Sequence, residues 1–391
     1  MSGDALTLLG REFEGFRRAV AAHAGAWAAG TVSARWLGLP ELEREVLSGT
    51  PDADLVLVPA DWLPALAHRG TVVPLDEHLA DRPPHGWPDA WMTSFRDGVG
   101  YDGALWGLPL HDGPQLLFRR TDLYAAHGLA APRTWQELAD HAVRLHDPDR
   151  CSGTVLAGAP DGHNNVYDFV LHLWRYGGDL LEGDRVVLDG VPARRALAFL
   201  RDLATGPVTP RAHELDSNGS GAELAAGRVA VAVNWAGYAA LAADGPVAAD
   251  VATAVVPVHD DGTPTTTVNA FWALAVTATC TRPTLAWDYL RHSTSAAMDL
   301  RTTASGASGA RRSTWADPEV LRERPEHASF EAAHAHSRPL PRVHRLPEVV
   351  QVLNELVDAV IWRGASADPA LAAAHARIEA VLEPASAGER R

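Results

Sequence analysis

This sequence of 391 residues contains no lysine, and its lysine-plus-arginine total of 34 consists of arginines alone. Several catalytic strategies need a lysine amine, among them Schiff-base formation and the phosphate contact of a Walker motif. The sequence therefore excludes pyridoxal-phosphate enzymes, P-loop nucleotidases and protein kinases. The formal net charge is −15. Such a chain repels nucleic-acid phosphates and anionic membrane surfaces, so we expect neither as a partner.

Cysteine is nearly absent as well, since the chain has only Cys151 and Cys280. They lie far apart in the sequence and form no CxxC pair, so no zinc-binding pattern exists. We expect no metal ion and no cofactor. The sequence leaves open whether the two thiols form a disulfide, and it favours two free ones.

No stretch of the sequence approaches the ~18 consecutive apolar residues of a membrane-spanning helix, so we expect no direct membrane insertion. The first residues, MSGDALTLLGREFEGF, also lack the basic segment, apolar stretch and cleavage site of a signal peptide. As the sequence reads, we expect a cytoplasmic protein. A leader outside this sequence would change that expectation to an extracellular or lipid-anchored protein.

The composition is that of a globular protein, with 47% hydrophobic and 21% charged residues, and the length suits two domains. Segments typical of strands, at 5–10, 31–38 and 53–60, alternate with segments typical of helices. The apolar run ADLVLVPA (53–60) suits a parallel strand that is covered on both faces. This order predicts an α/β fold with a doubly wound sheet.

A second group of strands follows after residue 110. The segments 115–120, 153–158 and 229–235 read as strands with helical patterns between them, which predicts a second α/β unit. The pattern then shifts, because the next two strands, 250–258 and 269–278, are joined by a turn. Helical patterns continue from about residue 311 to the end of the chain.

Two helix starts carry capping signals. Thr121 is the expected N-cap of the helix that follows the strand 115–120. Thr134 and Glu137 stand at capping-box spacing, so a helix should begin there. The pattern of residues 166–178 predicts another helix, which ends at two glycines.

A short polar loop joins two hydrophobic strands in the stretch YDGALWGLPLHDGPQLLFRR (101–120). Gly113 and Pro114 favour a bend there. Polar residues flank this bend, with His111 and Asp112 before it and Gln115 after it. From these residues alone, the loop is either a connector or the floor of a binding cleft.

The order of these motifs is similar to that of the extracellular solute-binding proteins of sugar ABC transporters, the maltose-binding-like family 1. The segments that carry the resemblance are PDADLVLVPADWLPALAHRGTVVPLDEHL, YDGALWGLPLHDGPQLLFRRTDLYAAHGLAAPRTWQELADHA, AAGRVAVAVNWAGYAAL, FWALAVTATCTRPTLAWDYLRHSTS and SGARRSTWADPEVL. Each segment is weak alone, but their order and spacing cover nearly the whole chain. The chain departs from the family in lacking a secretion signal and a lipid-anchor cysteine. It also reads NAF (269–271) before Trp272, where relatives usually carry small residues.

The resemblance implies an α/β, two-lobed fold of the periplasmic-binding-protein type II, with a ligand cleft between lobes that a hinge joins. One lobe would hold residues 1–110 plus 260–310, and the other residues 111–259 plus 311–391. The loop HDGPQ (111–115) would then be the first crossover between the lobes, at the base of the cleft.

A sugar presents its C–H face to an aromatic ring and its hydroxyls to planar polar groups. Trp235 is the first candidate, because it ends a strand and the resemblance places the family's aromatic plate there. The other candidates lie at strand ends, in loops and at helix starts. The full set of expected ligand-binding residues is Arg11, Glu12, Asp61, Trp62, His111, Asp112, Gln115, Asn165, Tyr167, Asn234, Trp235, Tyr238, Asn269, Phe271, Trp272 and Arg311.

Several of these candidates have a plain structural alternative. Asp61 and Asn165 can serve as helix caps. One of Phe271 and Trp272 must face the core, because neighbouring strand residues point to opposite faces. Arg311 can be a solvated arginine.

The resemblance implies a monomeric protein that captures a neutral carbohydrate, or a similar polyhydroxylated small molecule, by hinge closure, as in ABC sugar import. Its partner would be an ABC permease if the protein is exported. The alternative is a cytoplasmic enzyme or sensor on the same fold, acting in a biosynthetic pathway with His111, Asp112 or Asp61 as acid–base groups. No GxSxG, HExxH or GxGxxG motif stands in a suitable context, so binding without catalysis is favoured.

Overall fold

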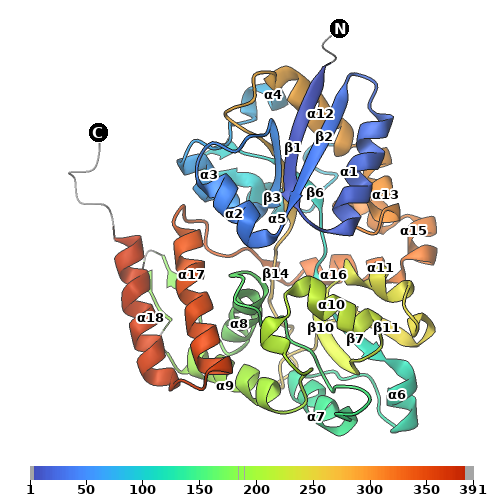
Figure 1. Cartoon of the computed structure of the whole chain (residues 1–391), viewed down its shortest axis with the longest axis vertical. Helices are drawn as coiled ribbons and strands as arrows, with labels where there is room; N and C mark the ends of the chain where they lie inside the picture. The colour runs from blue at the N-terminus through green and yellow to red at the C-terminus, as the bar shows by residue number, and fades with distance from the viewer. Residues whose placement is uncertain (1–3, 184, 189, 384–391) are drawn as a thin grey trace.

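Two β-sheets organise the chain, one in each of two lobes (Figure 1). The computed structural model describes residues 4–183, 185–188 and 190–383. The first sheet lies in the upper lobe of Figure 1 and the second in the lower lobe, and the chain crosses between them. The two alternating segments of the sequence therefore form separate sheets, as their patterns predict.

The first sheet has five strands in the order β2 (Thr31–Leu37), β1 (Ala5–Arg11), β3 (Leu55–Pro59), β13 (Trp272–Val276) and β6 (Leu108–His111). The first three strands are parallel, but β13 is antiparallel to both of its neighbours. Trp272 at the start of β13 pairs with Pro59 at the end of β3. The sheet is thus mixed, because β13 arrives from the other lobe and enters at the edge where β3 ends.

The second sheet has three antiparallel strands in the order β10 (Val231–Trp235), β7 (Gln115–Arg120) and β11 (Val251–Val255). The end of β10 lies beside the start of β7, since Trp235 pairs with Gln115. Both residues therefore lie at the edge that receives the first crossover.

Helices cover both sheets (Figure 1). Those of the upper lobe are α1 (Glu14–Ala26), α2 (Leu39–Leu47), α3 (Leu63–His68), α4 (Asp76–Asp81), α5 (Thr93–Val99), α12 (Pro283–Ser293) and α13 (Ala296–Ala304), with the 3₁₀ turn η1 (Ala60–Trp62). Those of the lower lobe are α6 (Thr121–Ala126), α7 (Trp135–Leu145), α8 (Asn164–Arg175), α9 (Val191–Thr205), α10 (Ser217–Ala225), α11 (Tyr238–Ala243), α17 (Leu346–Val357) and α18 (Ala367–Leu382). Short helices α14 (Arg312–Trp315), α15 (Pro318–Glu323) and α16 (Phe330–His334) lie beside the junction.

Three segments connect the lobes. The first, residues 112–114, runs from β6 to β7. The second runs from β11 to β13 and contains β12 (Thr267–Val268), and the third leaves α16 and contains β14 (Ser337–Arg338). Strands β12 and β14 pair in parallel, so the second and third crossing segments form one small ribbon. The remaining short strands, β4 (Gly100–Tyr101) with β5 (Ala104–Leu105) and β8 (Leu181–Glu182) with β9 (Arg185–Val186), are hairpins.

Two local predictions are wrong. Residues 153–158 form no strand and make only an isolated bridge, between Thr154 and Val208. Thr121 does not cap α6, because its hydroxyl donates to the Asp250 carbonyl at 3.1 Å instead. The capping-box prediction is confirmed, since the Thr134 side chain accepts from the Glu137 amide at the start of α7.

Both cysteines are free. The disulfide that the sequence leaves open is therefore not formed. Each thiol is partly buried, and burial raises the pKa of both.

Candidate functional site

A small cavity lies where the lobes meet. Its volume is about 50 Å³, which is room for about three or four water molecules if each needs about 10–15 Å³. Its walls come from the end of β1 and the start of α1, the first crossover, the loop before α8, the end of β10 and the start of β13. The lining residues are Arg11, Phe13, Phe16, His111, Gly113, His163, Trp235, Gly237, Tyr238, Ala270 and Trp272.

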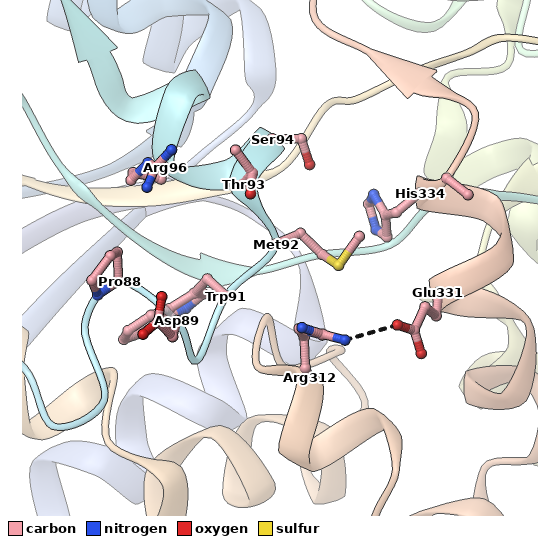
Figure 2. A pocket seen from close by; sticks show the side chains of 11 residues that line it. Pro88, Asp89, Trp91, Met92, Thr93, Ser94, Arg96, Arg312, Glu331 and His334 are labelled. Carbon is pink, nitrogen blue, oxygen red and sulfur yellow. Dashed lines mark hydrogen bonds and ion pairs between the residues drawn. The ribbon is translucent and has the colours of Figure 1, made fainter.

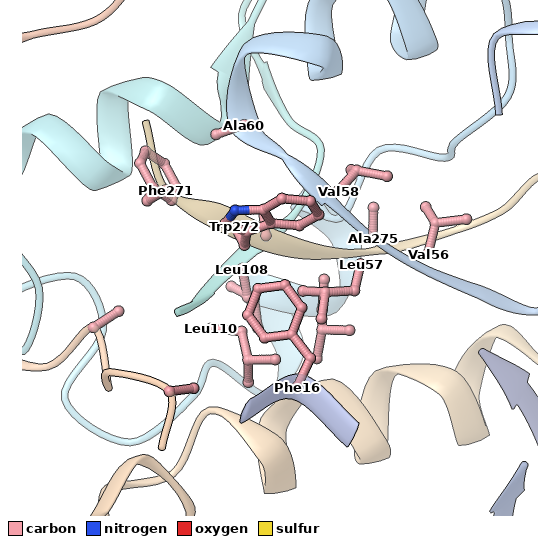
Figure 3. Packing of buried hydrophobic residues seen from close by; sticks show 14 of the residues in the cluster. Phe16, Val56, Leu57, Val58, Ala60, Leu108, Leu110, Phe271, Trp272 and Ala275 are labelled. Atoms are coloured by element: carbon pink, nitrogen blue, oxygen red, sulfur yellow. The ribbon is translucent and has the colours of Figure 1, made fainter. Parts of the chain in front are cut away.

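Aromatic rings form most of the cavity wall. On the upper side, the Phe16 ring lies 5.0 Å from Trp272 and 4.9 Å from His111, both edge-on (centroid distances). Figure 3 shows the Phe16 and Trp272 rings close together, while the Phe271 ring lies apart from the pair. Edge-on rings of this kind stabilise a rigid apolar surface.

The lower wall is held by hydrogen bonds to its polar edges. The Trp235 indole Nε1 donates to Oδ1 of Asn164 at 2.5 Å, and the Tyr238 hydroxyl donates to Oδ1 of Asn218 at 2.9 Å. A Cβ atom on Gly221 would lie only 2.4 Å from the Tyr238 ring, so this position requires glycine. Both rings are therefore fixed before any ligand arrives, which reduces the entropy lost on binding.

Arg11 brings a charge into the cavity. Its side chain is buried, and Nη2 donates to the Ser217 hydroxyl at 2.9 Å. The same nitrogen lies 3.6 Å from Oδ2 of Asp216, and the guanidinium carbon lies 6.0 Å from the centre of the Trp272 ring. Because Arg11 ends β1 and Ser217 begins α10, these contacts also join the lobes.

Two neutral histidines complete the lining. Burial lowers the pKa of His111 to about 4 and that of His163 to about 3. Nδ1 of His111 lies 2.9 Å from the Ser308 amide nitrogen and 3.0 Å from the Ser308 carbonyl oxygen. In the tautomer in which Nδ1 accepts from the amide, Nε2 carries the proton. This nitrogen lies beside Gly113 in the cavity wall, where it can donate to a ligand.

A second contact between the lobes lies next to the cavity. The Tyr167 hydroxyl donates to Oδ2 of Asp61 at 2.6 Å, and the Tyr167 ring meets Trp235 edge-on at 5.8 Å. Burial raises the pKa of Asp61, while the hydrogen bond from Tyr167 opposes that rise. Oδ1 of Asp61 is buried and has no hydrogen-bond partner among the described residues, and Asp61 itself is not among the residues that line the cavity.

Gln115 connects the first crossover to α8. Its Nε2 donates to Oδ1 of Asp168 at 3.2 Å, and burial raises the pKa of Asp168 to about 7. The buried Oε1 of Gln115 has no partner in the described part of the chain. Neither residue lines the cavity itself.

Four predicted site residues have protein partners instead of cavity contacts. Oδ2 of Asp112 lies 2.7 Å from Nε2 of His334, which connects the first crossover to α16. Asn165 lies in the first turn of α8 and donates to Asn354 of α17 at 2.5 Å, so it is not a helix cap. Asn234 donates to the Ser220 hydroxyl at 3.1 Å.

Arg311 is the fourth, and it is neither solvated nor in the cavity. Its guanidinium donates to the carbonyls of Thr294 at 2.7 Å and His85 at 3.0 Å, and it stacks 4.1 Å above the Trp91 ring. Its neighbour Arg312 pairs with Glu331 at 2.9 Å. We therefore assign Arg311 a packing role in the upper lobe.

The remaining candidates lie outside the cavity for different reasons. Trp62 and Phe271 belong to the core of the upper lobe, with Phe271 packed 4.8 Å from the Phe95 ring. Glu12 is exposed and pairs with Arg17 at 3.1 Å. Asn269 is buried, and neither side-chain polar atom has a partner within the described residues.

The sequence did not single out Phe13, Phe16 or His163. All three line the cavity. In the sequence, Phe13 and Phe16 look like apolar residues at the start of a helix. The one sign that they belong to the site is that they follow Arg11 closely. His163 precedes Asn164 and Asn165, which drew attention to the loop but not to the histidine.

A larger hollow of about 650 Å³ lies away from this cavity (Figure 2). Arg312 and Glu331 face each other across it and form an ion pair. His334 also lines it, but both ring nitrogens already face protein partners, Ser337 and Asp112. Arg312, Glu331 and His334 thus have partners within the protein, whereas the buried Trp91 Nε1 and Ser94 Oγ have none among the described residues.

Within the described residues, no three His, Cys, Asp or Glu side chains come together in a way that could hold a metal ion. In the same part of the chain, no helix is long and apolar enough to cross a membrane.

Comparison with known proteins identifies similar chains. The family of bacterial extracellular solute-binding proteins matches residues 29–299. A probable ABC transporter-binding protein of Deinococcus radiodurans is 24% identical over 349 residues, which are 84% of this chain and 80% of that protein.

Solved structures share the fold over almost the whole chain. A solute-binding protein of Agrobacterium radiobacter K84, in complex with ribitol, has a TM-score of 0.86 at 23% identity and covers 96% of this chain and 98% of its own. Maltose-bound MalE3 of T. maritima has a TM-score of 0.83 at 20% identity and covers 96% and 99%. The two-lobed α/β fold of type II that the sequence predicts is therefore confirmed.

Proposed function

The chain belongs to the family of bacterial extracellular solute-binding proteins, and we propose that it captures a sugar- or polyol-like small molecule between its lobes. The observation that carries this proposal is the cavity itself. Both lobes build it, and the fixed rings of Trp235 and Trp272 line it from opposite lobes. Such rings suit the C–H face of a polyhydroxylated ligand, and Asp61 offers an acceptor to its hydroxyls.

The size of the cavity supports a small ligand and a closing motion. Ligand pockets commonly measure ~300–1,000 Å³, and this cavity is far smaller. The lobes must therefore open to admit a ligand, and the crossing segments at 112–114, 267–268 and 337–338 are the hinge. A single sugar or short polyol fits this geometry better than an oligosaccharide does.

We propose lobe boundaries from packing. In this proposal, residues 4–111 and 272–310 go with the first sheet, and residues 115–255 go with the second. The Trp315 ring packs 6.0 Å from Phe95 of α5 and 5.7 Å from Phe330, which supports assigning α14–α16 to the upper lobe, with the lower lobe resuming at α17. The hinge closes these two bodies on each other.

The partner and location follow from the family. We propose that the protein meets its ligand outside the cell as a monomer and delivers it to an ABC permease. The family's extracellular role supports the location. One chain completes the cavity, which supports the monomer. Cell fractionation and light scattering of the purified protein test these two points.

A thermal-shift screen tests the function. The purified chain is heated with a panel of monosaccharides, polyols and oligosaccharides. A ligand at about 100 times its Kd adds about 2.7 kcal/mol of stability. We expect a shift with at least one small sugar or polyol, and mass spectrometry should recover that ligand unchanged. No shift with any of them, or a chemically altered ligand, contradicts the proposal.

A further inference from the structure

Arg11 is the only residue with a full charge among the eleven that line the cavity, all of which the structure describes. The other lining side chains are aromatic, small or neutral histidines. None of the eleven lining residues carries a carboxylate. The wall that a ligand meets is therefore apolar with one positive point.

The positive charge of Arg11 is only partly neutralised by the protein. Ser217 accepts a hydrogen bond from it but carries no charge. The Asp216 carboxylate is 3.6 Å away with its side chain 40% exposed, and its other oxygen caps α10 by accepting from the Gly219 amide at 2.8 Å. The partly buried Asp161 carboxyl also interacts with Arg11 electrostatically. A buried cation is stabilised most by an anion in direct contact, and because Arg11 lines the cavity, a ligand can supply one.

The remaining polar groups of the wall also donate. His111 can present an Nε2 proton, in the tautomer in which its Nδ1 accepts from the Ser308 amide. The indole of Trp235 and the hydroxyl of Tyr238 already donate to Asn164 and Asn218. A ligand group that accepts two or more hydrogen bonds and carries a negative charge complements this set.

We propose that the ligand is a small polyhydroxy carboxylate, such as a sugar acid, whose carboxylate binds Arg11 and His111 while its carbon chain lies between Trp235 and Trp272. This inference rests on the proposed function, because it uses the same cavity. The hydroxyls would reach toward Asp61 and its unpartnered Oδ1. The net charge of −15 does not oppose this arrangement, because charges beyond about 8 Å are largely screened at physiological ionic strength.

Isothermal titration calorimetry of the full chain with matched ligand pairs tests the proposal. The pairs are ribitol with ribonate, mannitol with mannonate, and glucose with glucuronate. We expect the acid of at least one pair to bind ten-fold or more tightly than its neutral partner. Arg11→Gln should remove that preference, and Arg11→Lys should keep part of it.

Arg17→Gln is the matched control, because Arg17 lies on α1, is exposed and pairs with Glu12 outside the cavity. Arg17→Gln should leave the affinities for the acid and for its neutral partner unchanged. Circular dichroism should show that Arg11→Gln, Arg11→Lys and Arg17→Gln are all folded. Binding of the neutral partners with equal or greater affinity overturns the inference and leaves the proposed function standing. A preference for the acid that survives in Arg11→Gln also overturns it. If no member of any pair binds, the inference and the proposed function both fail.

Discussion

The hydroxyl of Tyr167, in the lower lobe, lies 2.6 Å from Oδ2 of Asp61, at the end of β3 in the upper lobe. This hydrogen bond crosses the junction directly beside the aromatic cavity. Asp61 therefore contributes a contact that holds the lobes together, and its Oδ1 has no hydrogen-bond partner among the described residues.

Tyr167→Phe removes the hydroxyl that donates to the Asp61 carboxylate. Among the described residues, no other side chain donates a hydrogen bond to that carboxylate. A buried polar group left without a partner costs about 1–3 kcal/mol, so the free energy of unfolding should fall by that amount. Urea denaturation measures this change. In the double variant Asp61→Asn with Tyr167→Phe, the free energy of unfolding should fall by less than the sum of its decreases in the two single variants. Strict additivity would show that the two side chains do not interact.

Trp235→Ala should weaken ligand binding at least ten-fold, because it removes the lower aromatic wall of the cavity. Ten-fold corresponds to about 1.4 kcal/mol, within what one aromatic contact contributes together with its buried area. Trp62→Phe is the matched control, since Trp62 lies in the core and not in the cavity. It should lower the melting temperature and leave Kd unchanged. Equal Kd values for Trp235→Ala and the unaltered protein would refute this placement of the ligand.

Asp168→Asn should change how stability depends on pH. Burial raises the pKa of Asp168 to about 7 in the folded protein, from an ordinary value of about 3.9. Between these values the folded state binds more protons than the unfolded state, so this group lowers stability as pH rises. Relative to the unaltered protein, the free energy of unfolding of the variant should rise by about 4 kcal/mol between pH 4 and pH 8.

Asp140→Asn serves as the control for that measurement. Asp140 also accepts from a glutamine, Gln136 at 2.9 Å, but it is exposed on α7. Its stability difference from the unaltered protein should stay flat over the same pH range. A flat profile for Asp168→Asn would contradict the raised pKa.

Asp112→Ala should strongly destabilise the junction between the lobes. Its partner His334 is equally buried and connects to the third crossing segment through Ser337. Removing one member of a buried pair costs about 3–5 kcal/mol, whereas an exposed pair contributes about 0–1 kcal/mol. Glu331→Ala, which breaks the exposed pair with Arg312, is the comparison. Similar losses for the two variants in urea denaturation would contradict this difference.

The fold follows largely from patterns that the sequence displays. The apolar run that became β3 and the alternation around it predicted the first sheet. The mixed direction of that sheet was not predictable, because β13 comes from residues 272–276 and pairs only after the chain has crossed the junction twice. Thr121 failed as a cap because the Asp250 carbonyl, distant in sequence, competes for its hydroxyl.

The site was predictable where strand ends meet the junction. Arg11, His111, Trp235 and Trp272 each stand at the end or the start of a strand, and all four line the cavity. Asn234 directly precedes Trp235 in β10, but its side-chain amide already donates to the Ser220 hydroxyl. A strand end places a side chain at the correct edge, yet tertiary partners decide whether it stays available.

The crystal structure of the chain with the ligand that gives the largest thermal shift tests the central claim most directly. The account predicts electron density for one intact small molecule between Trp235 and Trp272, in contact with residues of both lobes. Density for the ligand outside this cavity, for example in the hollow beside Arg312 and Glu331, would contradict it.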